Sequence, residues 1–99
     1  MNANGSIRIG TTVSRAVAAA SASVALPTDA AGVTARTVIL TATVACYVRF
    51  GAAAVEATTT DLYLLAGESA NVYDVMGFTH VAGERVTGDG TLYITCVEG

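Results

Sequence analysis

The sequence predicts an all-β fold, a sandwich or barrel of seven to eight short antiparallel strands. Apolar and polar residues alternate with a period of two along most of the chain, as they do in half-buried strands. β-Branched residues dominate the alternating runs, and Gly, Asp or Pro clusters interrupt them roughly every eight to twelve residues, which is typical of sandwiches and barrels. A chain of 99 residues has room for one core, so residues 1–99 are expected to form a single domain.

Seven runs carry the alternation. In the first, Ile7 and Ile9 flank Arg8, and in the second Val38 and Leu40 share one face. The strands are expected at residues 6–12, 37–43, 45–50, 61–65, 70–75, 79–86 and 91–97. The phase of the alternation predicts a core that includes Val38, Leu40, Cys46, Val48, Phe50, Leu92 and Ile94.

The alanine-rich segment 17–26 supplies the eighth strand or a helix. Alanine is the best helix former, which favours a helix. The alternation of Ser21 and Ser23, followed by Val24, Leu26 and a proline, favours a strand, and the strand is the preferred interpretation.

Turn residues separate the strands. Gly88-Asp89-Gly90 between two alternating runs predicts a hairpin, because such residues tolerate the positive φ of tight turns. Ala66-Gly67-Glu68-Ser69 predicts a second turn, and Pro27 to Gly32 a longer loop. Residues 51–60 have no clear period and are expected to connect the two sheets.

The composition indicates an assembly. The chain is 53% hydrophobic with only 13% charged residues, yet no apolar run approaches the roughly 20 residues that span a bilayer. A domain of this size buries only about 60 to 65% of its unfolded surface by itself. Part of the apolar surplus is therefore expected at contacts with other subunits.

The charge pattern argues against two classes of partner. The chain has no lysine, and five arginines stand singly against eight acidic residues, for a net charge of −3. Nucleic-acid binding depends on clustered cations that pair with phosphates, and attachment to anionic lipids depends on a polybasic segment. We therefore expect neither a nucleic acid nor a membrane as partner.

No catalytic or metal-binding constellation is recognisable, so we expect no enzyme activity, no catalytic residues, no metal and no cofactor. Cys46 and Cys96 share the phase of core residues, which favours two buried free thiols over a disulfide between them. His80 is the single histidine and lacks triad partners. The acidic residues are isolated, and the closest pairs in sequence, Glu56 with Asp61 and Glu84 with Asp89, are expected to be solvated or to cap turns..

Aromatic residues give the clearest candidate contact surface. Tyr47, Tyr63 and Tyr93 fall on the phase opposite the predicted core. They suit either a protein interface, where amphipathic aromatic residues are enriched, or a platform for stacking sugars. The interface is the preferred interpretation, and Ile7, Arg8 and Ile9 in the N-terminal strand are candidates for the same role.

The segments 47–51 (YVRFG), 61–68 (DLYLLAGE) and 90–95 (GTLYIT) carry a resemblance. The chain from about Leu26 onward resembles small β-sandwich proteins encoded among the virion genes of tailed bacteriophages, of the head decoration or cement type. This resemblance implies a small antiparallel β-sandwich of jelly-roll type with seven to eight short strands, and it carries no catalytic residues.

The resemblance also implies a function. It points to a non-enzymatic structural protein of a phage particle that decorates or cements the capsid, assembled in the host cytoplasm and found in the virion. The expected partners are further copies of the chain, as a homotrimer, and the major capsid or other virion proteins. The alternatives are a tail, collar or fibre-base component and a carbohydrate-binding sandwich used for host attachment.

The N-terminal residues lie outside the resemblance. Residues 1–12 are interpreted as an extended arm that reaches a neighbouring subunit, because an extended segment can add a strand to an exposed sheet edge.

Overall fold

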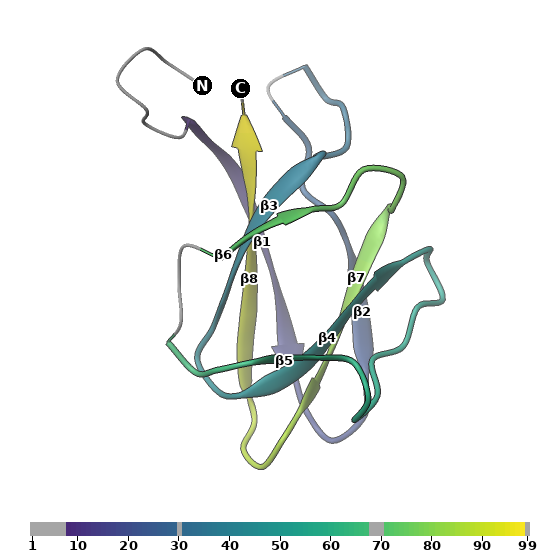
Figure 1. Cartoon of the computed structure of the whole chain (residues 1–99), viewed down its shortest axis with the longest axis vertical. Helices are drawn as coiled ribbons and strands as arrows, with labels where there is room; N and C mark the ends of the chain where they lie inside the picture. The colour runs from purple at the N-terminus through teal and green to yellow at the C-terminus, as the bar shows by residue number, and fades with distance from the viewer. Residues whose placement is uncertain (1–7, 30, 68–70, 99) are drawn as a thin grey trace.

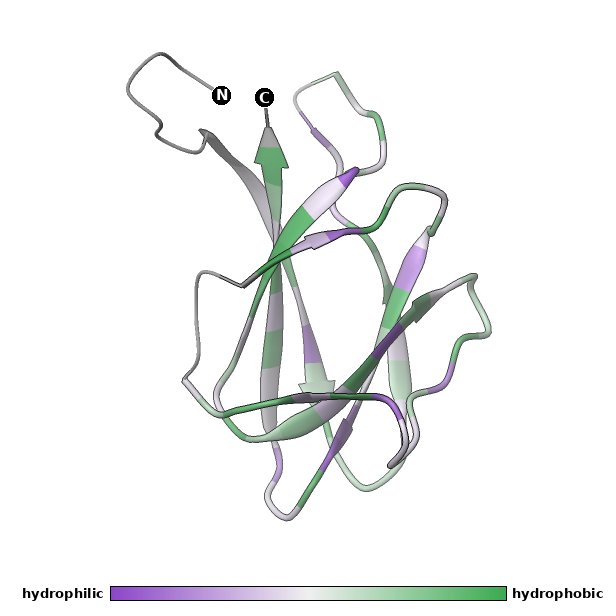
Figure 2. Ribbon diagram, viewed as in Figure 1, coloured by the Kyte–Doolittle hydropathy of each residue, from purple (hydrophilic) through white to green (hydrophobic). Residues whose placement is uncertain are grey.

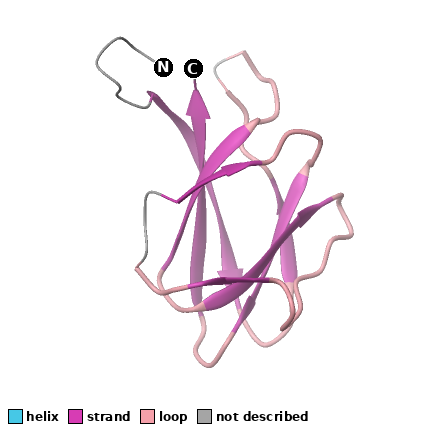
Figure 3. Ribbon diagram, in the orientation of Figure 1, coloured by secondary structure: helices cyan, strands magenta, loops and turns pink. Residues whose placement is uncertain are grey.

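The protein is an all-β sandwich, seen in a computed structural model that describes residues 8–29, 31–67 and 71–98. Two antiparallel four-stranded sheets pack face to face, and every element in the described residues is a strand or a loop (Figure 3). No membrane-spanning helix occurs in this part of the chain. The strands are β1 (Arg8–Val17), β2 (Ala22–Ala25), β3 (Thr37–Ala42), β4 (Cys46–Gly51), β5 (Leu62–Leu64), β6 (Asn71–Asp74), β7 (His80–Arg85) and β8 (Gly90–Glu98).

The strand order is that of a jelly roll. Sheet A has the order β1-β8-β3-β6 and sheet B the order β2-β7-β4-β5. Four antiparallel pairs are therefore nested, β4 with β5, β3 with β6, β2 with β7 and β1 with β8. This is one long antiparallel hairpin rolled into two sheets, which confirms the predicted β-sandwich of jelly-roll type.

The nesting decides which connections cross between the sheets. The chain changes sheet at every connection except the one between β4 and β5, which are neighbours in sheet B. The loop 51–60 therefore stays within one sheet, and the prediction that it joins the sheets is wrong. The predicted hairpin at Gly88-Asp89-Gly90 is also wrong, because this turn carries the chain from β7 in sheet B to β8 in sheet A.

The first strands differ from their predicted bounds. β1 continues to Val17, well beyond residue 12, because Val13 and Val17 keep the inward phase opposite Ile94 and Gly90. The alanine-rich segment is extended, as preferred from the sequence, but it holds the end of β1, a crossing at residues 18–21 and the whole of β2.

The N-terminal arm is only partly described. Residues 8–12 of the predicted arm form the first half of β1 and pair with β8 of the same chain. Residues 1–7 lie outside the described residues, so the arm stays a prediction for them alone.

The core is the layer of side chains between the two sheets. Along β3 the burial alternates strictly, with Val38, Leu40 and Ala42 buried and the residues between them partly exposed. The predicted core residues are confirmed except Phe50, which is half-buried at the side of this layer. Cys46 and Cys96 are free and buried, as expected. Figure 2 shows the apolar residues recurring along the strands of both sheets.

Gly83 shows how tightly the two sheets approach. It lies on β7 in the inward phase, opposite Val48. A Cβ atom at this position would lie 2.8 Å from Cγ1 of Val17 and 3.4 Å from Cδ2 of Leu92, two buried side chains of sheet A. The close approach of the sheets at this point depends on the missing side chain.

We predict that Gly83→Ala lowers the free energy of unfolding by about 1–3 kcal/mol, the usual range for overpacking a core. Val17→Ala should also destabilise the protein. The double variant should lose less free energy of unfolding than the two single losses added together, because Val17→Ala removes the Cγ1 methyl group that the new Cβ would clash with. Denaturant melts of the four proteins measure this coupling, and strictly additive losses would contradict it.

We also predict that Ile94→Ala costs about 2–5 kcal/mol, because Ile94 is fully buried in the centre of sheet A. Phe50→Ala should cost less than a fully buried phenylalanine does, since part of its ring is already solvated. Chemical denaturation checks both values, with Tyr93→Ala on the exposed face of the same strand as Ile94 as the control. If Ile94→Ala lowered the free energy of unfolding by less than about 0.5 kcal/mol, the inward orientation of Ile94 on β8 would be wrong.

Candidate interaction surface

Large exposed apolar side chains gather at one side of the sandwich, along its two short edge strands. β5 ends sheet B and β6 ends sheet A, and in Figure 1 both cross the front of the molecule while β2 lies at the back. We call this group of side chains the apolar rim. Its members are Leu62, Tyr63, Leu65, Val72, Met76 and Phe78, with exposures from 41% for Leu62 to 64% for Met76.

The rim exists because the sandwich is incompletely closed at this side. β5 has only three residues and β6 only four, so neither edge strand covers the full length of its neighbour. Three aromatic rings fill the opening: Phe50 is stacked on Phe78 at 6.3 Å between ring centroids and tilted against Tyr73 at 6.2 Å. Phe50 and Tyr73 are half-buried against the core, whereas Phe78 is 44% exposed and is itself a member of the rim.

The structure brings two of the three predicted tyrosines together. Tyr47 and Tyr63 lie directly opposite each other on β4 and β5, with their rings edge to face at 5.6 Å between centroids. Tyr93 is exposed as predicted, but it lies on the outer face of sheet A, on the other side of the molecule. The tyrosines therefore belong to two separate surfaces.

The N-terminal candidates lie elsewhere again. Arg8 and Ile9 pair through their backbones with Glu98 and Val97 at the start of β1, and β1 is the edge of sheet A remote from β6. Ile7 lies outside the described residues. The predicted interface residues therefore do not form one continuous patch.

The outer faces of the two sheets differ. On sheet A every outward side chain of the strands from residue 12 to residue 97 is at least partly exposed. Asp74, on the edge strand β6, is the single charged one among these described side chains. These side chains are Thr12, Ser14, Ala16, Thr37, Ile39, Thr41, Val72, Asp74, Thr91, Tyr93, Thr95 and Val97. Sheet A thus presents a nearly uncharged face rich in threonine.

On sheet B the loop between β4 and β5 covers part of the outer face. Ser23 Oγ donates a hydrogen bond to the carbonyl oxygen of Ala53 at 3.1 Å, and Ser21 Oγ accepts one from the amide of Ala57 at 2.8 Å. Both serines belong to the β2 side of the sheet, so the loop passes over β7. Ala82, which points outward from β7, is consequently fully buried.

Several of the isolated polar residues have structural partners. Asp61 accepts hydrogen bonds from the amide and the hydroxyl of Thr58 and caps a turn, as expected. Asp89 pairs with Arg85 at the exposed turn before β8. Nδ1 of His80 lies 2.8 Å from the hydroxyl of Thr79. Within the described ranges, no cluster of three or more His, Cys, Asp or Glu side chains could hold a metal ion.

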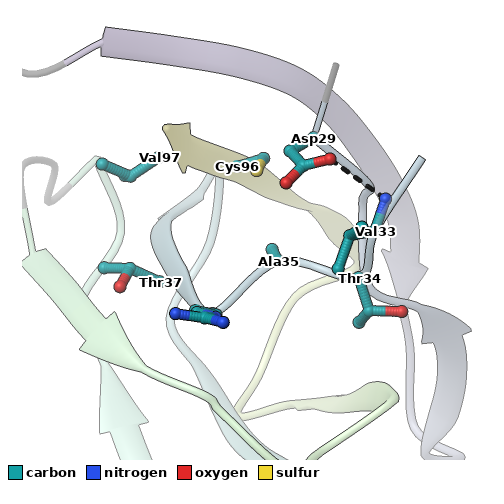
Figure 4. Close-up of a pocket in the computed structure, with 8 residues that line it drawn as sticks. Asp29, Val33, Thr34, Ala35, Thr37, Cys96 and Val97 are labelled. Atoms are coloured by element: carbon teal, nitrogen blue, oxygen red, sulfur yellow. Dashed lines mark hydrogen bonds between the residues drawn. The ribbon is translucent and has the colours of Figure 1, made fainter. Parts of the chain in front are cut away.

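A hollow lies near the β2–β3 loop (Figure 4). Its polar wall includes Asp29, whose Oδ1 accepts hydrogen bonds from the amides of Ala31 and Val33 at 2.9 and 3.0 Å. This carboxylate is therefore engaged in shaping the loop. Cys96 also borders the hollow, but its side chain is only 1% exposed.

Alternation alone does not identify most of the rim. Leu62 and Leu65 lie in a predicted strand without a distinct role, and Met76 lies in a predicted connection. The run Leu62-Tyr63-Leu64-Leu65 was the available signal, because a short strand that is apolar on both faces cannot have one face in water without exposing apolar surface.

Comparison with known proteins gives no relative: no family model, no curated protein and no solved structure matches the chain.

Burial raises the pKa of the Cys46 thiol above its usual value. The folded protein therefore holds this proton more tightly than the unfolded chain does. The protonated thiol makes its full contribution to the free energy of unfolding below the pKa of the unfolded chain, about 8.5. This contribution is lost as the pH rises through and beyond that value. We predict that the wild type loses more stability than Cys46→Ala between pH 7 and pH 10. Denaturant melts at both pH values test this, and equal losses in the two proteins would contradict it.

Proposed function

We propose that the protein is a non-enzymatic structural subunit that functions in an assembly through its apolar rim, and that this assembly is a phage particle whose capsid it decorates or cements. The observation that carries the proposal is the concentration of large exposed apolar side chains at one side of a small jelly-roll sandwich. Patches of exposed apolar side chains mark interaction sites in soluble proteins.

The size of the chain supports contacts of this kind. A stable interface buries about 800 Å² per partner. The described surface totals 5399 Å², so one interface would cover about 15% of it. We assign this interface to the two edge strands with the connection after β6, and the Tyr47–Tyr63 pair extends it onto the outer face of sheet B.

The finer assignment rests on the resemblance described above. Subunits that cement a shell contact both one another and the shell, which requires more than one surface. The apolar rim suits contacts between copies, with a homotrimer as the expected oligomer. The nearly uncharged outer face of sheet A suits contact with a capsid or other virion protein, because its single charged side chain, Asp74, lies at the β6 edge and the rest of the face brings no charge into an interface.

Carbohydrate binding is the second candidate function. It is favoured by the Tyr47–Tyr63 pair, which leaves Tyr63 48% exposed on an outer sheet face where a sugar ring could stack. A glycan-binding protein would retain this activity as an isolated chain, whereas a cement protein would not show it.

The rim predicts which substitutions weaken association. Leu65→Ser and Met76→Ser should each weaken self-association about five- to thirtyfold, as truncation of an apolar contact worth about 1–2 kcal/mol does. Val33→Ser is the matched control, because Val33 is equally exposed but lies in the β2–β3 loop away from the rim. Light scattering after size exclusion measures the mass of each protein. A soluble wild-type monomer at high micromolar concentration would count against the whole proposal.

Counting copies in purified particles separates the structural roles. A capsid cement protein should be present in hundreds of copies per particle, and a tail, collar or fibre-base component in a small multiple of three, five or six. Gel densitometry against the major capsid protein gives this number. Absence from the particle, combined with glycan binding by the isolated chain, would favour the second candidate.

A further inference from the structure

Sheet B has an open position beside β4. β4 pairs with β7 over its whole length, from Cys46 to Gly51. It pairs with β5 only from Cys46 to Val48, because β5 has three residues. The last three residues of β4 therefore have a strand on one side and, among the described residues, none on the other.

The backbone of β4 is oriented to accept a strand at this position. The carbonyl of Gly51 accepts a hydrogen bond from the amide of Thr79, which lies on the β7 side. Backbone groups of successive residues in a strand point to opposite sides. The amide and carbonyl of Phe50 therefore point away from β7, toward the side that β5 leaves open.

A cleft runs along these same residues, and its two sides differ in polarity. Phe50 and Phe78, the stacked aromatic pair, line its apolar side. Arg49, Glu56 and Thr58 also line it. Arg49 points to the outer face of the sheet, and neither Arg49 nor Glu56 forms a hydrogen bond or ion pair with any described residue. The cleft thus combines a backbone edge that has no strand partner among the described residues, an apolar wall and a polar wall. A site for strand addition has these same parts.

The N-terminal segment of the chain matches this site. Residues 2–7 read Asn-Ala-Asn-Gly-Ser-Ile, so polar residues alternate with small or apolar ones and none is charged. In an extended conformation one set of side chains would face Phe50 and Phe78, and the other would face Arg49, Glu56 and Thr58. We propose that residues 1–7 of a neighbouring copy add as a short strand beside β4, in the position that β5 leaves open. This proposal rests on the proposed self-association.

The reach of the segment favours a neighbouring copy over the same chain. β1 lies at the opposite side of the sandwich, and the open position is in the other sheet, beyond β2, β7 and β4. With sheets about 10 Å apart and strands about 4.8 Å apart, the two positions are separated by at least about 17 Å. Seven extended residues span about 23 Å. Within one chain only about two residues would then be left to occupy the cleft, whereas a neighbour can supply the whole segment.

A peptide of residues 1–7 tests the cleft directly. It is added to a variant that lacks residues 1–7, and backbone amide shifts are followed by NMR. We expect saturable shifts at Arg49–Gly51 and Phe78. Ala54→Arg, which fills the cleft, should weaken binding at least tenfold, and the matched control Ala53→Arg should not, because Ala53 is an exposed neighbour outside the cleft. No saturable shift, or equal binding by both variants, would overturn the proposal.

A cross-link tests whether the donor is a neighbour. In the full chain, Ser6→Cys combined with Glu56→Cys should form disulfide-linked dimers and larger species under mild oxidation, and neither single variant should do so. Cys46 and Cys96 are buried and do not interfere while the protein is folded, which circular dichroism verifies. A disulfide formed only within one chain would overturn the assignment to a neighbour.

The two proposals fail separately. If Leu65→Ser and Met76→Ser leave assembly unchanged while the peptide still binds beside β4, the proposal that the rim mediates self-association is wrong and the proposed strand addition is supported. If these variants dissociate the assembly but the peptide does not bind, the proposed strand addition is wrong and self-association through the rim is supported.

Discussion

The nested antiparallel pairing of the strands is the constraint on which the rest of this structure depends. Once β4 and β5 are adjacent, β3 lies beside β6, β2 beside β7 and β1 beside β8, so the two ends of the described chain meet in one strand pair. Rolling this long hairpin into two sheets leaves one layer between them. All the fully buried side chains among the described residues are apolar, and Gly83 lets the sheets approach at β7.

The same nesting creates the functional surfaces. The innermost pair, β4 with β5, is joined by a loop that crosses the outer face of sheet B, where Ser21 and Ser23 hold it. β5 itself has only three residues. A short β5 exposes the apolar rim and leaves the end of β4 without a strand partner. The open position beside β4 and the part of the rim on β5 therefore share a structural cause, and the rest of the rim lies on and after the equally short β6.

The two outer faces are suited to different tasks. The loop that covers sheet B protects Ala82 and builds one wall of the cleft beside β4. Sheet A carries no such cover in its described residues, and its threonine-rich face is nearly free of charge. A subunit with one apolar side and one flat neutral face can contact copies of itself and a different protein at the same time. This combination is the physical basis of the proposed structural function.

The sequence by itself determined the fold class, the strand phase and most of the core. The alternation along residues 37–43 placed Val38 and Leu40 inward, and the burial of these side chains requires only local geometry. It also identified Cys46 and Cys96 as buried thiols.

Only the tertiary structure decided which strands share a sheet, that Gly88 to Gly90 crosses between sheets, and that Tyr47 meets Tyr63 while Tyr93 lies apart. Alternation repeats every two residues and reports which face of a strand is buried, but it holds no information about the neighbour across the hydrogen bonds. The half-burial of Phe50 and the exposure of the rim follow from the short lengths of the two edge strands β5 and β6, which become edges only through the pairing of strands distant in the sequence.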